Sequence, residues 1–349
     1  MRFNLEKLVR PNIQNLKPYS SARSEFSGGA SVLLDANENA FGSPAGNGYN
    51  RYPDPLQGEL KRRVAEIKGI SPDRIFVGNG SDEAIDLLIR IFCEPGRDTV
   101  ITCPPTYGMY GVAAAINNIE DIKVLLTDDF QLDVESVKQA VTPSTKLIFI
   151  CSPNNPTGNL MCRESVIEIA KEFEGIVIVD EAYIDFAAGP SFIEEFQKLP
   201  NIVVLQTFSK AWGMAGLRVG LAFASIEIID LMSRVKPPYN VSGIAQCALL
   251  NALNKRPQIT AWVAEALKER ARLVSALSNL NIVEKVYPSD ANFVLAKVAE
   301  TNKIYQSLID KKVVVRNRNN VELCGGCLRI TIGTPEENQM LLNALKDEG

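Results

Sequence analysis

Thr207-Phe208-Ser209-Lys210-Ala211-Trp212-Gly213-Met214-Ala215-Gly216-Leu217-Arg218-Val219-Gly220 follows an apolar, strand-like run and contains a lysine next to a serine, with an arginine further on. A lysine amine attacks an aldehyde when its neighbours keep it partly unprotonated and fixed, and the apolar residues after Lys210 favour this. Ser209 and Arg218 are residue types that bind phosphate. A lone Ser-Lys pair is more often part of a surface loop, so the interpretation of Lys210 as a Schiff-base lysine depends on the rest of the chain.

Short apolar runs bounded by turn residues recur through the middle of the chain, and amphipathic segments separate them. Continuous β-branched runs are typical of strands that are buried on both faces. The strand-like runs cover 99–102, 146–150, 175–179, 201–205 and 217–222, and the helical segments cover 82–91, 133–140, 163–173 and 190–198. This alternation predicts an α/β fold with a mostly parallel sheet covered by helices.

A second, smaller α+β unit is predicted after the proline-containing segment 236–240. A long helix over 257–280 begins it, and the later elements are strands over 291–295, 313–315 and 328–332 and helices over 302–311 and 336–345. We expect residues 1–34 to form an N-terminal arm that is part of the small domain, 35–254 to form the large domain and 255–349 to form the small C-terminal domain.

Composition excludes several classes of function. The net charge of −4 provides no basic surface for a nucleic acid, and no apolar run is long enough to span a membrane. Seven scattered cysteines indicate reduced thiols, and a cytoplasmic location is expected. The absence of histidine excludes histidine bases, and we expect no metal site. Proton transfer must therefore use another residue type.

The segment Gly78-Asn79-Gly80-Ser81-Asp82-Glu83 precedes an apolar helix. Its backbone N–H groups and the Ser81 hydroxyl would face an anion at the helix N-terminus, and a phosphate suits this position. The segment differs from the dinucleotide-binding motif G-x-G-x-x-G, because Glu83 stands at the last position. The chain has no phosphate-loop signature G-x-x-x-x-G-K-[ST]. An ordinary N-cap turn explains Ser81 and Asp82 equally well when the segment is taken alone.

Two further predicted strands end in polar residues. Asp180 follows the apolar run 176–179 at the edge of the sheet where ligands usually bind. An aspartate that binds magnesium in an ATPase works together with a phosphate loop, and the chain has no such signature. A pyridinium nitrogen is therefore the better partner for Asp180. Asn155, in the segment 151–158, would face the same edge, although a proline-rich turn is the simpler explanation of that segment alone.

Taken together and in order, these four motifs resemble the fold-type-I aminotransferases, which use pyridoxal 5′-phosphate. Further segments narrow the resemblance to the histidinol-phosphate aminotransferase family: 16–23, 34–39, 50–55 and 328–334. The similarity covers nearly the whole chain. It implies a large domain with a mostly parallel sheet and a smaller α+β domain, as the alternation of elements also predicts.

The resemblance implies a role for each candidate residue. Lys210 would bind the cofactor covalently, Asp180 would face its pyridinium nitrogen and Tyr107 would stack on its ring. Asn155 and Tyr183 would contact its phenolic oxygen. The cofactor phosphate would be held by Gly80, Ser81, Asp82, Ser209 and Arg218, together with Tyr52 from the other subunit of a homodimer. The substrate would be held by Tyr19, Asn155, Arg316 and Arg329.

The implied reaction is transamination between histidinol phosphate and 2-oxoglutarate, or in reverse between imidazole acetol phosphate and glutamate, in histidine biosynthesis. An aromatic or broad-range amino acid aminotransferase shares the cofactor motifs. A decarboxylase of a phosphorylated amino acid is also reachable from this scaffold, because bond choice depends on substrate orientation. The pair Cys324 and Cys327 departs from the family pattern and leaves the geometry near Arg329 open.

Overall fold

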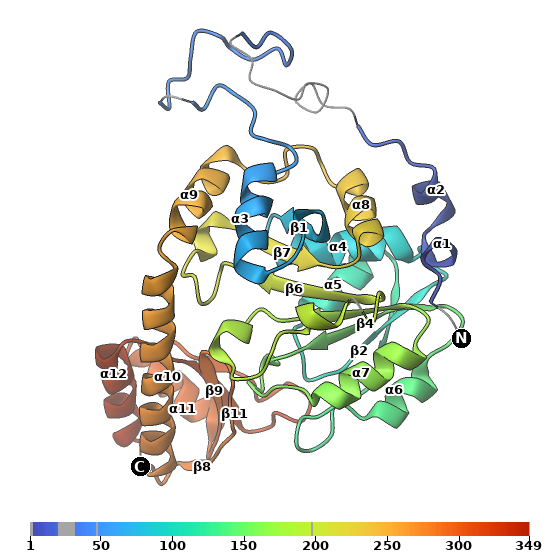
Figure 1. The fold of residues 1–349 in the computed structure, drawn as a ribbon. Helices are drawn as coiled ribbons and strands as arrows, with labels where there is room; N and C mark the ends of the chain where they lie inside the picture. Colours follow the sequence, from blue (N-terminus) through green and yellow to red (C-terminus); the bar gives the residue numbers. More distant parts are fainter. Residues whose placement is uncertain (1–2, 20–31, 47, 197, 349) are drawn as a thin grey trace.

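The computed structural model describes residues 3–19, 32–46, 48–196 and 198–348. A seven-stranded sheet forms the centre of the larger unit (Figure 1). Its strands, in spatial order, are β1 (Ile75–Gly78), β7 (Gly220–Phe223), β6 (Ile202–Thr207), β5 (Ile176–Asp180), β4 (Thr145–Cys151), β2 (Thr99–Thr102) and β3 (Glu120–Lys123). Only β7 runs antiparallel to its neighbours, so the predicted α/β fold with a mostly parallel sheet is confirmed.

Helices cover both faces of this sheet. On one face lie α4 (Ser81–Phe92), α5 (Met109–Ile116) and α8 (Ile226–Val235), and on the other lie α3 (Gly58–Lys68), α6 (Val134–Ala140), α7 (Arg163–Glu172) and α9 (Gly243–Leu253). Strand residues alternate between the two cores: Ile75 and Val77 belong to one, and Phe76 belongs to the other. The continuous apolar runs therefore reflect burial on both faces.

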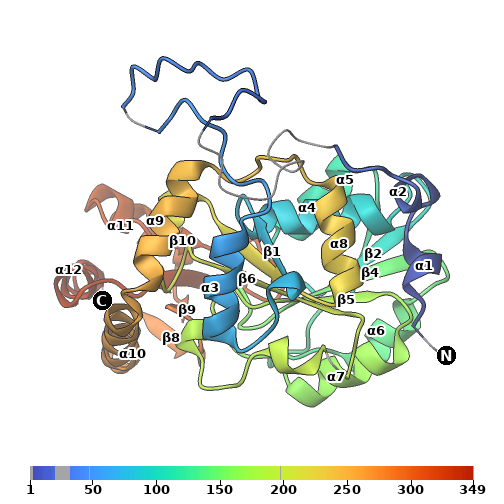
Figure 2. The same cartoon turned by 45° about the horizontal axis from the view of Figure 1, so that its top comes forward.

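The smaller unit is a four-stranded antiparallel sheet with three helices on it. The strand order is β10 (Arg316–Asn317), β11 (Cys327–Thr331), β9 (Phe293–Val298) and β8 (Val283–Val286), and the helices are α10 (Arg256–Ser278), α11 (Thr301–Asp310) and α12 (Pro335–Lys346). The smaller unit lies beside the large one, and the long α10 leads into it (Figure 2). Its core is formed by one face of the sheet and these helices.

A tight contact joins the two units close to the end of β4. The backbone N–H of Asp290 donates to the carbonyl of Gly158 at 2.7 Å, and the Asp290 carboxylate accepts from the N–H of Leu160 at 3.0 Å. Gly158 has a φ of 90°, and a Cβ at this position would lie 2.5 Å from Ser289 Oγ. This contact places the smaller sheet next to the turn that carries Asn155.

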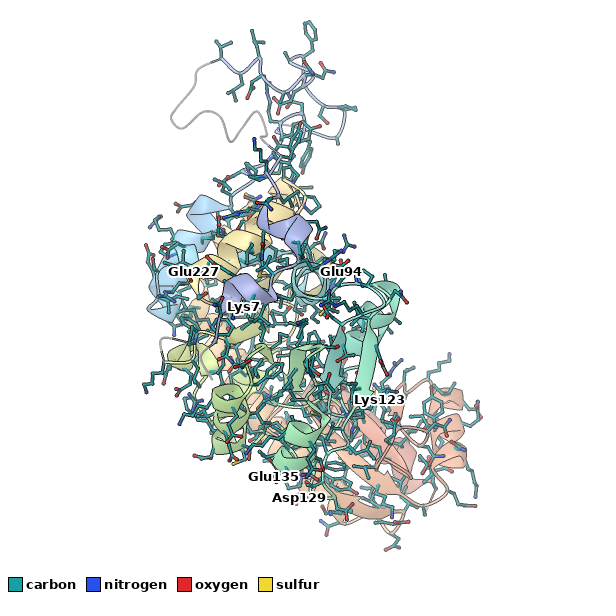
Figure 3. The ribbon with its side chains drawn as sticks, turned by 90° about the vertical axis from the view of Figure 1, so that its right-hand side faces the viewer. Lys7, Glu94, Lys123, Asp129, Glu135 and Glu227 are labelled. Atoms are coloured by element: carbon teal, nitrogen blue, oxygen red, sulfur yellow. The ribbon has the colours of Figure 1, made fainter. Side chains whose placement is uncertain are left out.

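The first two helices, α1 (Leu5–Leu8) and α2 (Pro11–Gln14), lie against the large unit (Figure 3, where Lys7 of α1 is labelled). Val9 and Ile13 are buried in the core that contains α4, and Arg10 forms an ion pair with Glu94 at 3.0 Å. Apolar burial thus attaches Val9 and Ile13 to the large unit, and the assignment of residues 1–34 to an arm of the small domain stays a prediction. The division at 254/255 stays a prediction. Within the described ranges no helix combines the length and apolarity of a membrane span.

Candidate active site

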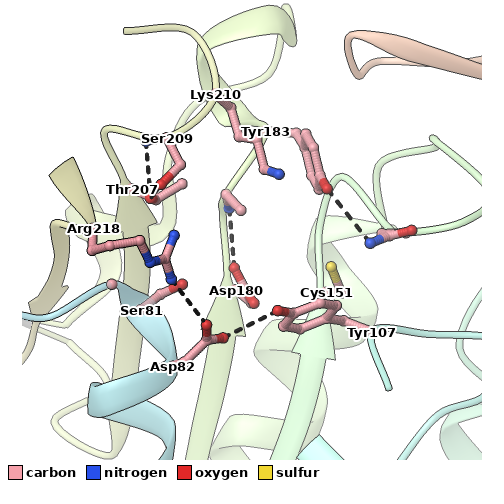
Figure 4. A pocket seen from close by; sticks show the side chains of 13 residues that line it. Ser81, Asp82, Tyr107, Cys151, Asp180, Tyr183, Thr207, Ser209, Lys210 and Arg218 are labelled. Carbon is pink, nitrogen blue, oxygen red and sulfur yellow. Dashed lines mark hydrogen bonds and ion pairs between the residues drawn. The ribbon is translucent and has the colours of Figure 1, made fainter. Parts of the chain in front are cut away.

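A cavity lies at the carboxyl ends of β4, β5 and β6, next to the N-terminus of α4 (Figure 4). Its empty space is about 530 Å³ with the open side included. All of the predicted cofactor residues except Tyr52 line it: Gly80, Ser81, Asp82, Tyr107, Asn155, Asp180, Tyr183, Ser209, Lys210 and Arg218. Cys151, Ala182 and Thr207 also line it and were not predicted. The parallel topology brings these distant segments to one edge.

At one end of the cavity, two glycines allow the N-terminus of α4 and the Arg218 side chain to come close together. Ser81 is the first residue of α4, and Gly80 before it has a φ of 77°. A Cβ on Gly80 would lie 2.8 Å from the Arg218 guanidinium, and a Cβ on Gly220 would overlap the backbone nitrogen of Ser81. Arg218 itself has a φ of 55°. Glycine at positions 80 and 220 therefore lets a helix N-terminus and an arginine converge, which creates a site for an anion.

Asp82 connects two of the predicted residues through its side chain. Its carboxylate accepts a hydrogen bond from Tyr107 OH at 3.1 Å and pairs with Arg218 at 3.3 Å. Burial raises the pKa of the Tyr107 phenol, and the Asp82 charge adds to this, so Tyr107 stays a neutral hydrogen-bond donor.

Asp180 is buried at the end of β5 and has two hydrogen-bond donors. The N–H of Ala182 donates to one carboxylate oxygen at 3.1 Å, and Tyr110 OH donates to the other at 2.7 Å. Burial raises the pKa of Asp180 to about 6, although both hydrogen bonds oppose this. A cation placed against this carboxylate would reverse the shift and keep Asp180 ionised.

Tyr110 is a functional residue that sequence reasoning missed. It is fully buried on α5, and its ring stacks on Phe149 with centroids 4.9 Å apart. In the sequence it is one aromatic residue of an apolar helix, where a packing role is the ordinary expectation. Only the fold shows that its hydroxyl reaches Asp180.

Lys210 lies in the loop after β6 and points into the cavity (Figure 4). Its Nζ is 5.4 Å from the centre of the Tyr183 ring. Burial lowers the pKa of Lys210, and the positive charge of Arg329 adds to the effect. Two backbone hydrogen bonds hold the loop: Gly213 N–H to the Lys210 carbonyl at 2.9 Å and Met214 N–H to the Phe208 carbonyl at 3.0 Å. The loop backbone is thus held in place, and the lowered pKa makes the amine easier to deprotonate than an ordinary lysine.

Asn155 and Tyr183 meet the smaller sheet at the opposite side of the cavity. Asn155 Nδ2 donates to Tyr183 OH at 3.5 Å, and Arg329 Nη1 donates to Asn155 Oδ1. The Arg329 guanidinium also lies 5.2 Å from the ring centre of Phe293. The structure therefore brings Arg329, which is far away in the sequence, to the candidate cofactor residues.

Four predicted residues do not line this cavity within one chain: Arg329, which reaches it only through Asn155, and Tyr52, Tyr19 and Arg316. Tyr52 is 51 % exposed, stacks on Tyr239 at a centroid distance of 4.4 Å and lines a second, wider cavity beside α9. Tyr19 is 76 % exposed, and the neighbouring positions 20–23 lie outside the described residues. Arg316 is exposed on β10, opposite Arg329.

The family model for class I and II aminotransferases matches residues 26–345. The chain belongs to this family. A histidinol-phosphate aminotransferase from Parabacteroides distasonis is 57 % identical to it over 99 % of both chains. Among solved structures, the histidinol-phosphate aminotransferase from Clostridium acetobutylicum is similar with a TM-score of 0.79 at 26 % identity, covering 86 % of this chain and 91 % of that one. The enzyme from Sinorhizobium meliloti, solved in complex with pyridoxal-5′-phosphate, gives 0.78 at 24 % identity over 97 % and 96 %.

The cofactor of this aminotransferase family is pyridoxal 5′-phosphate, and the cavity fits it. The helix N-terminus at Ser81 and the nearby Arg218 provide donors for a phosphate. The buried Asp180 carboxylate suits a positively charged ring nitrogen, and the Lys210 amine lies within the same cavity. The cavity therefore offers donors to the cofactor phosphate, a carboxylate to its ring nitrogen and an amine to its aldehyde.

Proposed function

We infer that this aminotransferase catalyses transamination between histidinol phosphate and 2-oxoglutarate, a step of histidine biosynthesis. The observation that carries the inference is the 57 % identity over 99 % of both chains with a histidinol-phosphate aminotransferase. The geometry supports it, because Arg329 approaches the cavity that holds Lys210 and Asp180 and provides a cation for an anionic substrate. The same relative favours this reaction over transamination of aromatic amino acids and over decarboxylation.

The residues of the cavity would hold the cofactor by charge and shape. When bound, pyridoxal 5′-phosphate supplies an electron sink for the electron pair left by deprotonation of the substrate. Asp180 would accept a hydrogen bond from the ring nitrogen and keep it protonated. Tyr107 would pack on the ring, and Tyr183 and Asn155 would bind the phenolic oxygen. The phosphate would be bound by Gly80, Ser81, Asp82, Ser209 and Arg218.

Lys210 would perform the proton transfers. Its Nζ would first anchor the cofactor aldehyde and, once displaced by the substrate amine, take the proton from the substrate carbon that carries the nitrogen. Burial and Arg329 lower the pKa of this amine, which increases the fraction able to accept a proton. The loop hydrogen bonds from Gly213 and Met214 keep it close to the reacting carbon. One residue thus serves as anchor and base in a chain without histidine.

Arginine would allow one site to bind both substrates in turn. Its planar guanidinium donates two parallel hydrogen bonds to a carboxylate or to a phosphate. Arg329 and Arg316 would therefore bind the phosphate of histidinol phosphate and a carboxylate of glutamate at the same place. Asn155, which accepts from Arg329, would orient that guanidinium.

The proposed assembly is a homodimer in which Tyr52 reaches the cofactor phosphate of the partner subunit and Tyr19 contributes to the substrate site. In one chain Tyr52 lies half-exposed in a cavity that it shares with Tyr239 and Ile244 of α9. Tyr49 and Ile244, which line the same cavity, also have exposed apolar side chains. Such a surface is typical of a subunit interface. A cytoplasmic location is also proposed, because all seven cysteines are free thiols.

The test is an absorption spectrum of the cofactor-loaded protein before and after addition of histidinol phosphate without a keto acid. The spectrum of the lysine-bound cofactor should convert to that of pyridoxamine phosphate, and 2-oxoglutarate should reverse the change. If histidinol phosphate leaves the spectrum unchanged while an aromatic amino acid converts it, the substrate assignment is wrong but the cofactor assignment stands.

A further inference from the structure

Three arginines lie on one face of the smaller sheet. The register pairs Arg316 directly with Arg329, and the N–H of Arg318 donates to the carbonyl of Cys327 at 2.9 Å, which extends the pairing beyond β10. Opposite residues of an antiparallel pair share a face, and every second residue along a strand returns to it. All three side chains therefore leave the sheet on the same side. Leu328, on the other side, is buried in the small-unit core.

This face is turned toward the cavity. Arg329 donates to Asn155, which lines it. Cys324, in the loop that joins β10 to β11, and Cys327, the first residue of β11, are buried in a core of the large unit and hold this part of the sheet against it. Arg318, in the same loop, is partly buried. Burial is the largest cause of the lowered pKa of Arg318, and the Tyr183 phenol is among the groups whose charge acts on it. Arg318 lies on the same face of the sheet as Arg329, which contacts the cavity through Asn155.

The three arginines have no acidic partner in the described ranges. The arginine ion pairs found there are formed by other arginines: 10, 51, 62, 63, 90, 163, 218, 234 and 272. The Nε atoms of Arg318 and Arg329 are buried, and neither has a hydrogen-bond partner among the described residues. Like charges placed opposite one another destabilise a sheet, and an unsatisfied buried donor adds to that cost. A bound anion removes both penalties.

We propose that Arg318 is a third anion-binding arginine of the substrate site and makes it selective for a phosphate monoester over a carboxylate. This rests on the proposed function. A phosphate monoester carries a charge of about −1.5 to −2 at pH 7 and three acceptor oxygens, whereas a carboxylate has a single charge and two oxygens. Arg316 and Arg329 together provide the charge and the donors that a carboxylate needs. Arg318 supplies the additional charge and donors that only the phosphate uses.

The experiment compares the holoenzyme with its Arg318→Gln variant on three substrates: histidinol phosphate, histidinol and glutamate. We expect kcat/KM for histidinol phosphate to fall ~10- to 100-fold, the effect of losing a hydrogen bond between two charged groups. The values for histidinol and glutamate should change little. Arg318→Lys, which keeps the charge without the planar fork, should lie in between. Arg97→Gln is the matched control, because Arg97 is exposed in the loop after α4 and away from the cavity.

An equal fall for all three substrates, or no fall for histidinol phosphate, would overturn the proposal. A melting temperature measured on each variant distinguishes a role in binding the phosphate from a merely structural role. A merely structural Arg318 would lower stability and all three activities together. Failure of the wild-type enzyme to convert histidinol phosphate contradicts the proposed function itself. That result is independent of any variant, so the two inferences are tested separately.

Discussion

At the scale of single residues, the site depends on hydrogen bonds that hold Asp180 in place. Tyr110→Phe keeps the buried ring and its stacking on Phe149 but removes the donor to the carboxylate. We expect the pKa of Asp180 to rise further and the affinity for pyridoxal 5′-phosphate to fall ~10-fold, because a hydrogen bond to a charged group is lost. A cofactor titration and a pH profile of kcat measure this. Tyr305→Phe on α11 is the control, and identical results for the two variants would contradict a positioning role for Tyr110.

The ionised Asp180 carboxylate should lower the free energy of unfolding when no cofactor is bound. Its pKa is raised from 3.8 to about 6, so the folded protein binds a proton more tightly than the unfolded chain. Stability therefore falls as pH rises from about 4 to about 6, and the loss is complete at pH 7. Asp180→Asn should make the cofactor-free protein more stable at pH 7 by about 1–3 kcal/mol, since one pKa unit corresponds to about 1.4 kcal/mol. Urea unfolding at pH 7 and pH 4 checks this, and the variant should have its advantage only at pH 7.

At the scale of elements, the N-terminus of α4 is positioned by the close approach of β7. A Cβ on Gly220 would overlap the backbone of Ser81 and Gly80, so Gly220→Ala must push α4 away. We expect a loss of about 1–3 kcal/mol in the free energy of unfolding, as for other overpacked sites, together with weaker binding of the cofactor phosphate. Gly216→Ala is the control, because nothing lies within 4 Å of a Cβ there. Equal unfolding midpoints for both variants would show that this contact does not limit the position of α4.

Two elements differ from the prediction for identifiable reasons. The predicted helix over 190–198 is only a short 3-10 turn, Phe192–Glu195, because the buried Glu181 carboxylate takes the N–H of Phe192 and the hydroxyl of Ser191. The predicted strand over 313–315 is a connection after α11, since Val313 N–H bonds back to the Leu308 carbonyl, and pairing begins only at β10. In both cases a tertiary or helix-end hydrogen bond overrides the local apolar pattern.

At the scale of the whole molecule, the proposed dimer can be tested by mixing two defective chains. Lys210→Ala removes the amine that anchors the cofactor in its own cavity. Tyr52→Phe weakens cofactor binding in the cavity to which Tyr52 contributes. If Tyr52 acts across the interface, half of the cavities in a mixed dimer regain every wild-type residue. Cofactor affinity and activity of the mixture, after dissociation and reassociation, should then exceed the average of the separate variants. Activity equal to that average would place Tyr52 in its own chain's site, or outside it.

The alternation of strands and helices can be predicted from the sequence alone, because burial on both faces of a sheet requires continuous apolar runs such as 176–179. The sequence also predicted that Lys210, Asp180, Asn155 and the Gly80-Ser81-Asp82 turn lie together, because each follows a strand whose carboxyl end meets the same edge, and all of them line one cavity. The residues that surround them become visible only once the chain is folded. The hydrogen bond from Tyr110 to Asp180, the shared face of Arg316, Arg318 and Arg329, and the packing of Val9 and Ile13 on the large sheet join segments far apart in the chain. Local pattern does not encode such contacts, because they depend on how complete elements pack.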